Sequence, residues 1–149
     1  MTMQHDFSLR NFDDLMRVAL ADGPAQRLLL VLLGVERMHR RTADGAMEAI
    51  EGEGTLTPMM VRDRPLEAGL TFADIAAEAD ATGQSWEFLM VALLPGRDGE
   101  PPSSADAEPH LRRMAKVILT GADTSGFAFF DRDGDAVSLA ASSAGSDDG

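Results

Sequence analysis

The chain has 149 residues, a formal net charge of −12 and no cysteine. Without cysteine it has no disulfides, thiolate metal sites or thiol nucleophiles, and its acidity opposes binding to nucleic acid phosphates. Its length is that of one ordinary domain, which can bury a core without covalent cross-links.

The N-terminal part predicts a helix followed by a strand. Asn11 is a suitable N-cap, and Phe12, Leu15, Met16 and Ala19 recur at helical spacing. Gly23-Pro24 ends this helix, and a strand is expected over 26–33.

Two uninterrupted apolar runs indicate the architecture. The first spans 28–33 and the second 88–94. A run of six or seven apolar residues is short for a buried helix and typical of a strand covered on both faces. We therefore expect two central strands with helices or loops on each side.

Residues 34–54 show no clear periodicity. The segment has a basic and then an acidic cluster, with several glycines between and after them, and it predicts a mobile loop that can include a short helix over 43–50. The following residues 57–61 predict a short strand, in which Pro58 requires either an edge position in the sheet or a place among the first residues of the strand.

The second half predicts two more helices and a hairpin. Thr71 and Asp74 form a capping box for a helix with its apolar stripe at Phe72, Ile75, Ala76 and Ala79, ending near Gly83. The third helix is capped by Ser103 or Ser104, ends at Gly121, and is kinked or started by Pro109. Its expected stripe comprises Leu111, Met114, Ala115, Ile118 and Leu119.

The C-terminal part predicts a β-hairpin. Two short strands, 127–130 and 136–139, flank Asp133-Gly134, a dipeptide typical of tight turns.

The predicted fold class is α/β or α+β, a single three-layer domain over 11–139 with a central mixed sheet and about three helices. Residues 1–10 are expected to form a flexible tail, and 140–149 a disordered acidic tail.

No catalytic, cofactor or metal motif is complete. The phosphate-loop spacing at 121–126 is followed by Phe127 and Ala128 in place of Lys and Ser or Thr. Residues 131–135 start like a calcium loop, but Ala136 and Ser142 replace the required Gly and Glu. The three histidines lack metal-binding spacing. We therefore expect no catalytic residues, no cofactor and no metal, and interpret 131–135 as a turn.

Two groups of basic residues are candidates for interaction. Arg37, His39, Arg40 and Arg41 can hold an anion or an acidic peptide, because guanidinium groups match carboxylates. Arg62 and Arg64 follow an edge strand, to which a partner strand can add. The first group can instead be a solvated loop of an acidic protein, and the charges of the second can protect the edge from strand addition. Met59, Met60 and Met90 can line a pocket or fill the core, and Trp86 is expected to be a packing anchor.

Several segments together resemble a family of small proteobacterial proteins commonly labelled ribonucleotide reductase subunit alpha. The resemblance covers about residues 11–139 and includes 12–15, 26–29, 56–60, Trp86 with its apolar run, 102–107 and 130–134. The label is not literal, because a reductase large subunit is much longer and works through cysteines. The resemblance implies a self-contained bacterial domain and transfers no site residues.

The sequence favours a non-enzymatic interaction or regulatory domain of the bacterial cytoplasm that binds an unidentified protein. Two alternatives remain: a small-ligand or nucleotide-responsive module, and an acidic inhibitor that masks a basic target. No signal peptide is recognisable in residues 1–25 and no run reaches the length of a membrane span. We expect neither nucleic acid nor membrane partners, and the oligomeric state stays open.

Overall fold

A computed structural model describes residues 9–23 and 25–138. One five-stranded sheet, in the order β2-β1-β3-β4-β5, organises the fold. The elements are α1 (Phe12–Asp22), β1 (Gln26–Arg41), β2 (Met47–Pro65), α2 (Phe72–Asp80), β3 (Phe88–Pro95), α3 (Ser104–Thr120), β4 (Ala128–Phe130) and β5 (Ala136–Val137). All four neighbouring pairs are antiparallel, so the expectation of a mixed sheet was wrong.

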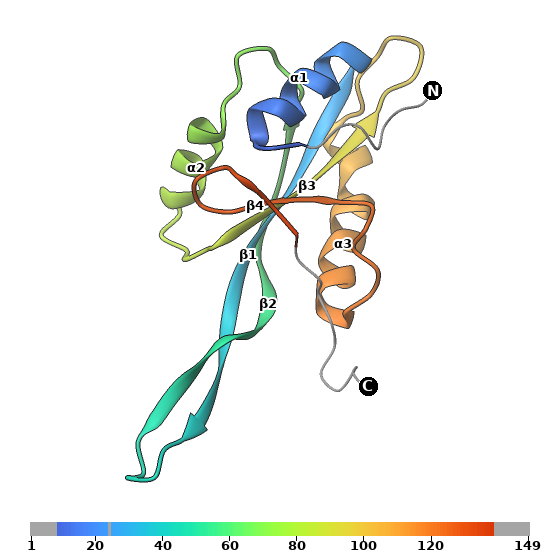
Figure 1. The fold of residues 1–149 in the computed structure, drawn as a ribbon. Coiled ribbons are helices and arrows are strands. Elements are labelled where there is room, and N and C mark those ends of the chain that lie inside the picture. The colour runs from blue at the N-terminus through green and yellow to red at the C-terminus, as the bar shows by residue number, and fades with distance from the viewer. Residues whose placement is uncertain (1–8, 24, 139–149) are drawn as a thin grey trace.

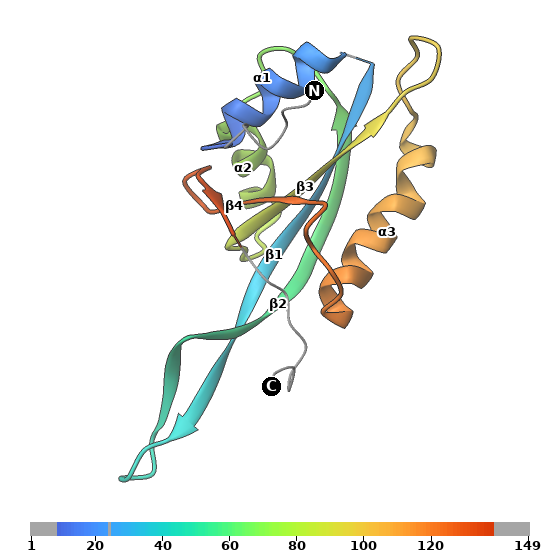
Figure 2. The same ribbon diagram turned by 45° about the vertical axis from the view of Figure 1, so that its right-hand side comes forward.

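Helices cover both faces of the sheet, which gives the three layers expected from the apolar runs (Figures 1 and 2). Helices α1 and α2 lie on one face and α3 lies on the other. Alternate residues of β1 enter the two cores: Leu28, Leu30 and Leu32 pack beneath α1 and α2, and their neighbours Leu29, Val31 and Leu33 pack beneath α3. The two buried central strands are thereby confirmed as β1 and β3.

Side-chain caps fix where the helices begin. Asn11 accepts a hydrogen bond from the backbone N–H of Asp14, and both Thr71 and Ser103 form complete capping boxes. Pro109 lies inside α3. The expected stripe of α3 was wrong at one position, because Leu119 is 68% exposed whereas Leu111, Met114 and Ile118 are buried.

The largest correction concerns residues 34–54. They form no loop and no helix: β1 continues to Arg41, β2 begins at Met47, and a turn over 42–46 joins the two strands. The strand expected over 57–61 is the middle of β2. The edge position inferred from Pro58 is confirmed, because β2 is the first strand of the sheet.

The C-terminal hairpin is confirmed. The backbone N–H of Gly134 donates to the carbonyl of Asp131 across the turn between β4 and β5. Residues 1–8 and 139–149 lie outside the described part of the chain, so both tails stay predictions. No described helix is both long enough and apolar enough to cross a membrane.

Candidate functional site

The feature that dominates the shape of the molecule is a projecting hairpin, which we call the arm: residues 34–41 of β1, the turn, and residues 47–57 of β2 (Figures 1 and 2). The buried part of β1 ends at Leu33. Strand β3 begins at Phe88, which is the register partner of Leu33. Beyond that point β2 is the only described strand that pairs with β1, so the arm is a two-stranded ribbon.

The tip of the arm is held by a compact turn. The N–H of Thr42 donates to the carbonyl of Ala46 at 2.7 Å, and the N–H of Gly45 donates to the carbonyl of Thr42 at 3.0 Å. The Asp44 carboxylate accepts bonds from the Thr42 hydroxyl and the Ala46 N–H. These two bonds hold the pKa of Asp44 below its usual range, the hydroxyl contributing most.

The basic residues predicted for interaction lie along the β1 strand of the arm. Arg40 forms an ion pair with Glu48 across the ribbon at 3.4 Å, and Arg41 donates to the carbonyl of Gly45 at 3.5 Å. His39 is exposed, and the side chain of Arg37 lies outside the described part of the structure. Arg40 and Arg41 therefore contact other residues of the arm, and such exposed interactions contribute little to stability.

The other two candidates lie on the body half of β2, opposite the buried part of β1. Arg64 pairs with Glu78 of α2 at 2.7 Å, and its Nε is buried without a hydrogen-bond partner among the described residues. Arg62 is exposed and pairs in register with Leu30. The six predicted residues thus fall on two halves of one strand pair, and the structure does not bring them into a single site.

An apolar groove of about 330 Å³ lies where the arm leaves the body. It is lined by Gly34, Val35, Glu36, Thr57, Met59, Ser85, Trp86 and Glu87. The Met59 side chain packs over Gly34, where an added Cβ would meet its Cγ and Sδ at 3.1 Å. Sequence reasoning missed this groove because its walls come from three distant segments. Of the three methionines considered for a pocket, only Met59 lines it, whereas Met90 is fully buried beneath α3.

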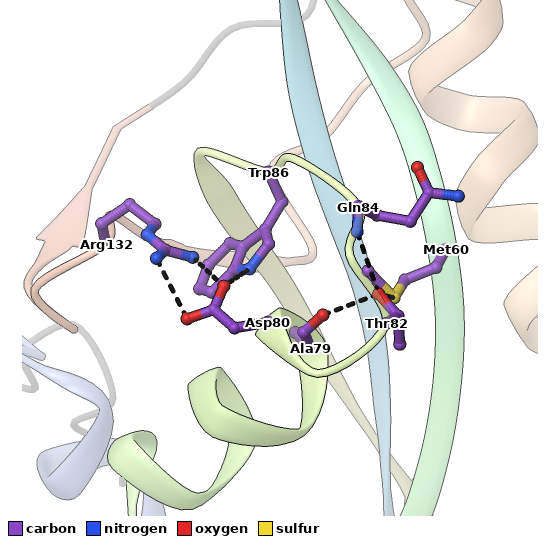
Figure 3. A network of polar contacts seen from close by, with 7 residues as sticks. All are labelled: Met60, Ala79, Asp80, Thr82, Gln84, Trp86 and Arg132. Carbon is purple, nitrogen blue, oxygen red and sulfur yellow. Dashed lines mark hydrogen bonds and ion pairs between the residues drawn. The ribbon is translucent and has the colours of Figure 1, made fainter.

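A polar network joins the end of α2 to the C-terminal hairpin (Figure 3). The Asp80 carboxylate accepts hydrogen bonds from Trp86 Nε1 at 2.9 Å and from Arg132 at 3.0 and 3.2 Å. The Arg132 guanidinium also lies 4.0 Å from the centroid of the Trp86 ring. These donors lower the pKa of Asp80, Arg132 contributing most. With its side chain 4% exposed, Trp86 is the packing anchor that the sequence predicted.

Two other clusters of ionisable groups have structural roles. Carboxylate oxygens of Asp131, Asp133 and Asp135 lie within 4.8 Å of one another, but one Asp131 oxygen accepts the backbone N–H groups of the other two and closes the turn. Near the N-terminus of α3, Asp106 lies beside Arg97 and His110 in a pocket of about 510 Å³.

Asp106 acts as a helix cap in this pocket. Its carboxylate accepts the Ser103 N–H, and its pKa is lowered chiefly by that bond, so it is a weak base. The arm and the groove at its base therefore stand out as the surface without an evident structural task. Comparison of the chain with family models, curated proteins and solved structures found no match.

Proposed function

We propose that this protein is a non-enzymatic interaction domain and that its partner protein binds the arm. The observation that carries the proposal is the arm itself, a hairpin that leaves the body (Figure 2). At its base Leu56 still packs against the core beneath α3, and beyond that point no described element covers either face of the ribbon. An isolated two-stranded hairpin is only marginally stable in water. A chain that extends one so far beyond its core has a surface suited to being completed by another molecule.

The distribution of charge supports a protein partner over a nucleic acid. Along the arm, β1 carries Arg37, Arg40 and Arg41, whereas β2 carries Glu48, Glu51 and Glu53. Since one strand is basic and the other acidic, the ribbon lacks the uniform positive charge that a phosphate backbone requires. A basic strand beside an acidic strand instead favours a specific orientation of a protein partner.

The test removes the arm without touching the body. Glu36 and Thr55 are register partners, so residues 37–54 can be replaced by a two-residue Asn-Gly turn. Tagged wild-type and shortened proteins are used to retain partners from a lysate of the organism that encodes the chain. We expect at least one protein to be retained by the wild type and lost with the shortened arm.

A matched control variant separates the arm from the other candidate surface. Arg62→Ala changes an exposed residue on the body half of β2 and should retain the same partner. A partner that binds the shortened protein as well as the wild type would contradict the proposal. A rise in melting temperature with nucleoside phosphates, abolished by joint substitution of Arg37, Arg40 and Arg41 with Ala, would favour the ligand module instead.

A further inference from the structure

The way the backbone groups of β1 alternate identifies which of its residues lie on the open edge of this strand in the arm. In a central antiparallel strand, alternate residues hydrogen-bond to opposite neighbours. The carbonyls of Ala25 and Leu33 accept bonds from the β3 side, from Gly96 and Glu87 N–H groups at 2.9 and 2.7 Å. The carbonyl of Gln26 accepts from Leu66, on the β2 side, at 3.0 Å. Odd-numbered residues of β1 therefore face β3, and even-numbered residues face β2.

Beyond Leu33 the odd-numbered residues have no β3 to face. The pairing with β2 continues without a break from Leu33 to Arg37, so the alternation is kept. The N–H and C=O groups of Val35 and Arg37 consequently point to the open side of the arm, directly beside the groove lined by Met59 and Trp86. Within residues 9–23 and 25–138 no strand pairs with this edge, which lies next to the apolar groove.

In the body half of the sheet, the outer edge of β2 is protected. Because Leu66 bonds to Gln26, the residues of β2 that face outward include Pro65, Asp63 and Val61, and beyond the register shift Pro58. Prolines at both ends of this stretch remove amide donors, a usual way of blocking strand addition. The edge marked by Arg62 and Arg64 is thus the poorer site for a partner strand.

From this geometry we propose that an extended, acidic segment of the partner protein adds as a strand to β1 beside Val35–Arg41, with one apolar side chain seated in the groove. The proposal rests on the proposed function and specifies its chemistry. A groove of about 330 Å³ suits a single large apolar side chain, while the added backbone hydrogen-bonds to Val35 and Arg37.

Charge selects an acidic segment and disfavours a second copy of this chain. Residues 35–41 contain three arginines against one glutamate. The groove itself is lined by Glu36 and Glu87, so the acidic residues of the segment are expected beside Arg37–Arg41 and its apolar residue in the groove. Pairing two copies of this edge would place basic residues beside basic residues, which destabilises a sheet. Arg40 can meet an incoming carboxylate because its ion pair with Glu48 is long and exposed.

The experiment uses a random peptide library displayed on phage, selected against the intact protein. Val35→Pro removes an N–H that faces the open edge and is not used in pairing with β2, and Val61→Pro does the same on the outer edge of β2. We expect the selected peptides to be acidic with an apolar anchor, and to bind about tenfold more weakly to V35P but unchanged to V61P.

A second measurement needs no substitution. Amide hydrogen exchange of the wild type with a selected peptide should slow at Val35 and Arg37 and stay unchanged at Val61 and Asp63. Peptides that bind V35P as well as the wild type, that are basic, or that protect neither Val35 nor Arg37 would overturn the proposal, as would failure to select any peptide.

The arm-shortened protein distinguishes a failure of strand addition from a failure of the proposed function. Peptides that bind V35P normally but are lost with the shortened arm would overturn strand addition and leave the arm as the binding site. Peptides that bind both variants normally would overturn strand addition and the proposed function together.

Discussion

The two halves of the β1–β2 pair share one antiparallel pairing but differ in burial. In the body half, residues Leu28 to Leu33 are at most 2% exposed, enclosed by helices on both faces. In the arm half the same strands continue with no described side chain buried, and Met47 is 60% exposed. Pairing therefore extends a strand but burial stabilises it, since each buried aliphatic side chain contributes roughly 1.5–3 kcal/mol.

The largest expected effect comes from the body half. Leu30→Ala should lower the free energy of unfolding by about 2–5 kcal/mol, because it removes buried methyl groups and leaves a cavity. Met47→Ala, at the base of the turn in the arm, is the matched control and should change it by less than about 0.5 kcal/mol. Urea denaturation of the two variants measures both values. Equal losses of stability would contradict the proposed difference between the body half and the arm half.

Shortening the arm should lower stability much less than a cavity in the core does. Replacing residues 37–54 by Asn-Gly is expected to change the free energy of unfolding by at most about 1 kcal/mol, because the segment buries little and loop length matters weakly. A loss as large as that of L30A, measured by urea denaturation, would mean that the arm is part of the core.

The exposed network at the end of α2 offers an intermediate case within the body. Arg132→Ala removes the cation over Trp86 and should cost about 0.5–1 kcal/mol. Trp86 is the single tryptophan, so its fluorescence should shift towards that of a solvated indole. Arg132→Lys keeps the charge but not the paired guanidinium donors. Its fluorescence spectrum and its free energy of unfolding should lie between those of the wild type and R132A. An unchanged spectrum in R132A would contradict this role.

The same network predicts a dependence on pH. The pKa of Asp80 is lowered in the folded protein by Arg132 and then by Trp86. Because the pKa is lowered in the folded state, the ionised Asp80 stabilises the fold at pH values above its unfolded pKa of about 3.9. This contribution is lost as the pH falls below that value and through the folded pKa. The stability difference between wild type and Asp80→Asn should therefore be constant near neutral pH and shrink below about pH 4. A difference that grows in acid would contradict it.

The smallest expected effect is in the arm. A double-mutant cycle of Arg40→Ala and Glu48→Ala should give a coupling energy below about 0.5 kcal/mol, since both side chains are more than half exposed. A coupling well above 1 kcal/mol would show that the arm is stabilised by its own charges.

Local signals were enough for most of the body. Caps at Asn11, Thr71 and Ser103 and two apolar runs predicted the helices and the central strands, because each depends on neighbours in the sequence. The arm also had a local signal, Asp44-Gly45, the same kind of turn dipeptide that correctly predicted the C-terminal hairpin. It was missed because the flanking strands are solvated on both faces and lack the alternation that burial imposes.

The candidate site was less predictable than the fold. The basic residues of the arm were identified, but as members of a loop. The groove requires Gly34, Met59 and Trp86 to meet, and no spacing in the sequence shows that contact. The open edge at Val35 depends on where β3 begins relative to β1, which only the register reveals.

Amide hydrogen exchange of the free protein tests the central contrast most directly. Leu30 and Glu36 both face β2 in the ladder, but Leu30 lies beneath the helices and Glu36 lies in the arm. We predict that the Leu30 amide exchanges only through global unfolding, whereas the Glu36 amide exchanges orders of magnitude faster through local opening of the arm. Equal protection of the two amides would contradict the account, because the arm would then be as stable as the core.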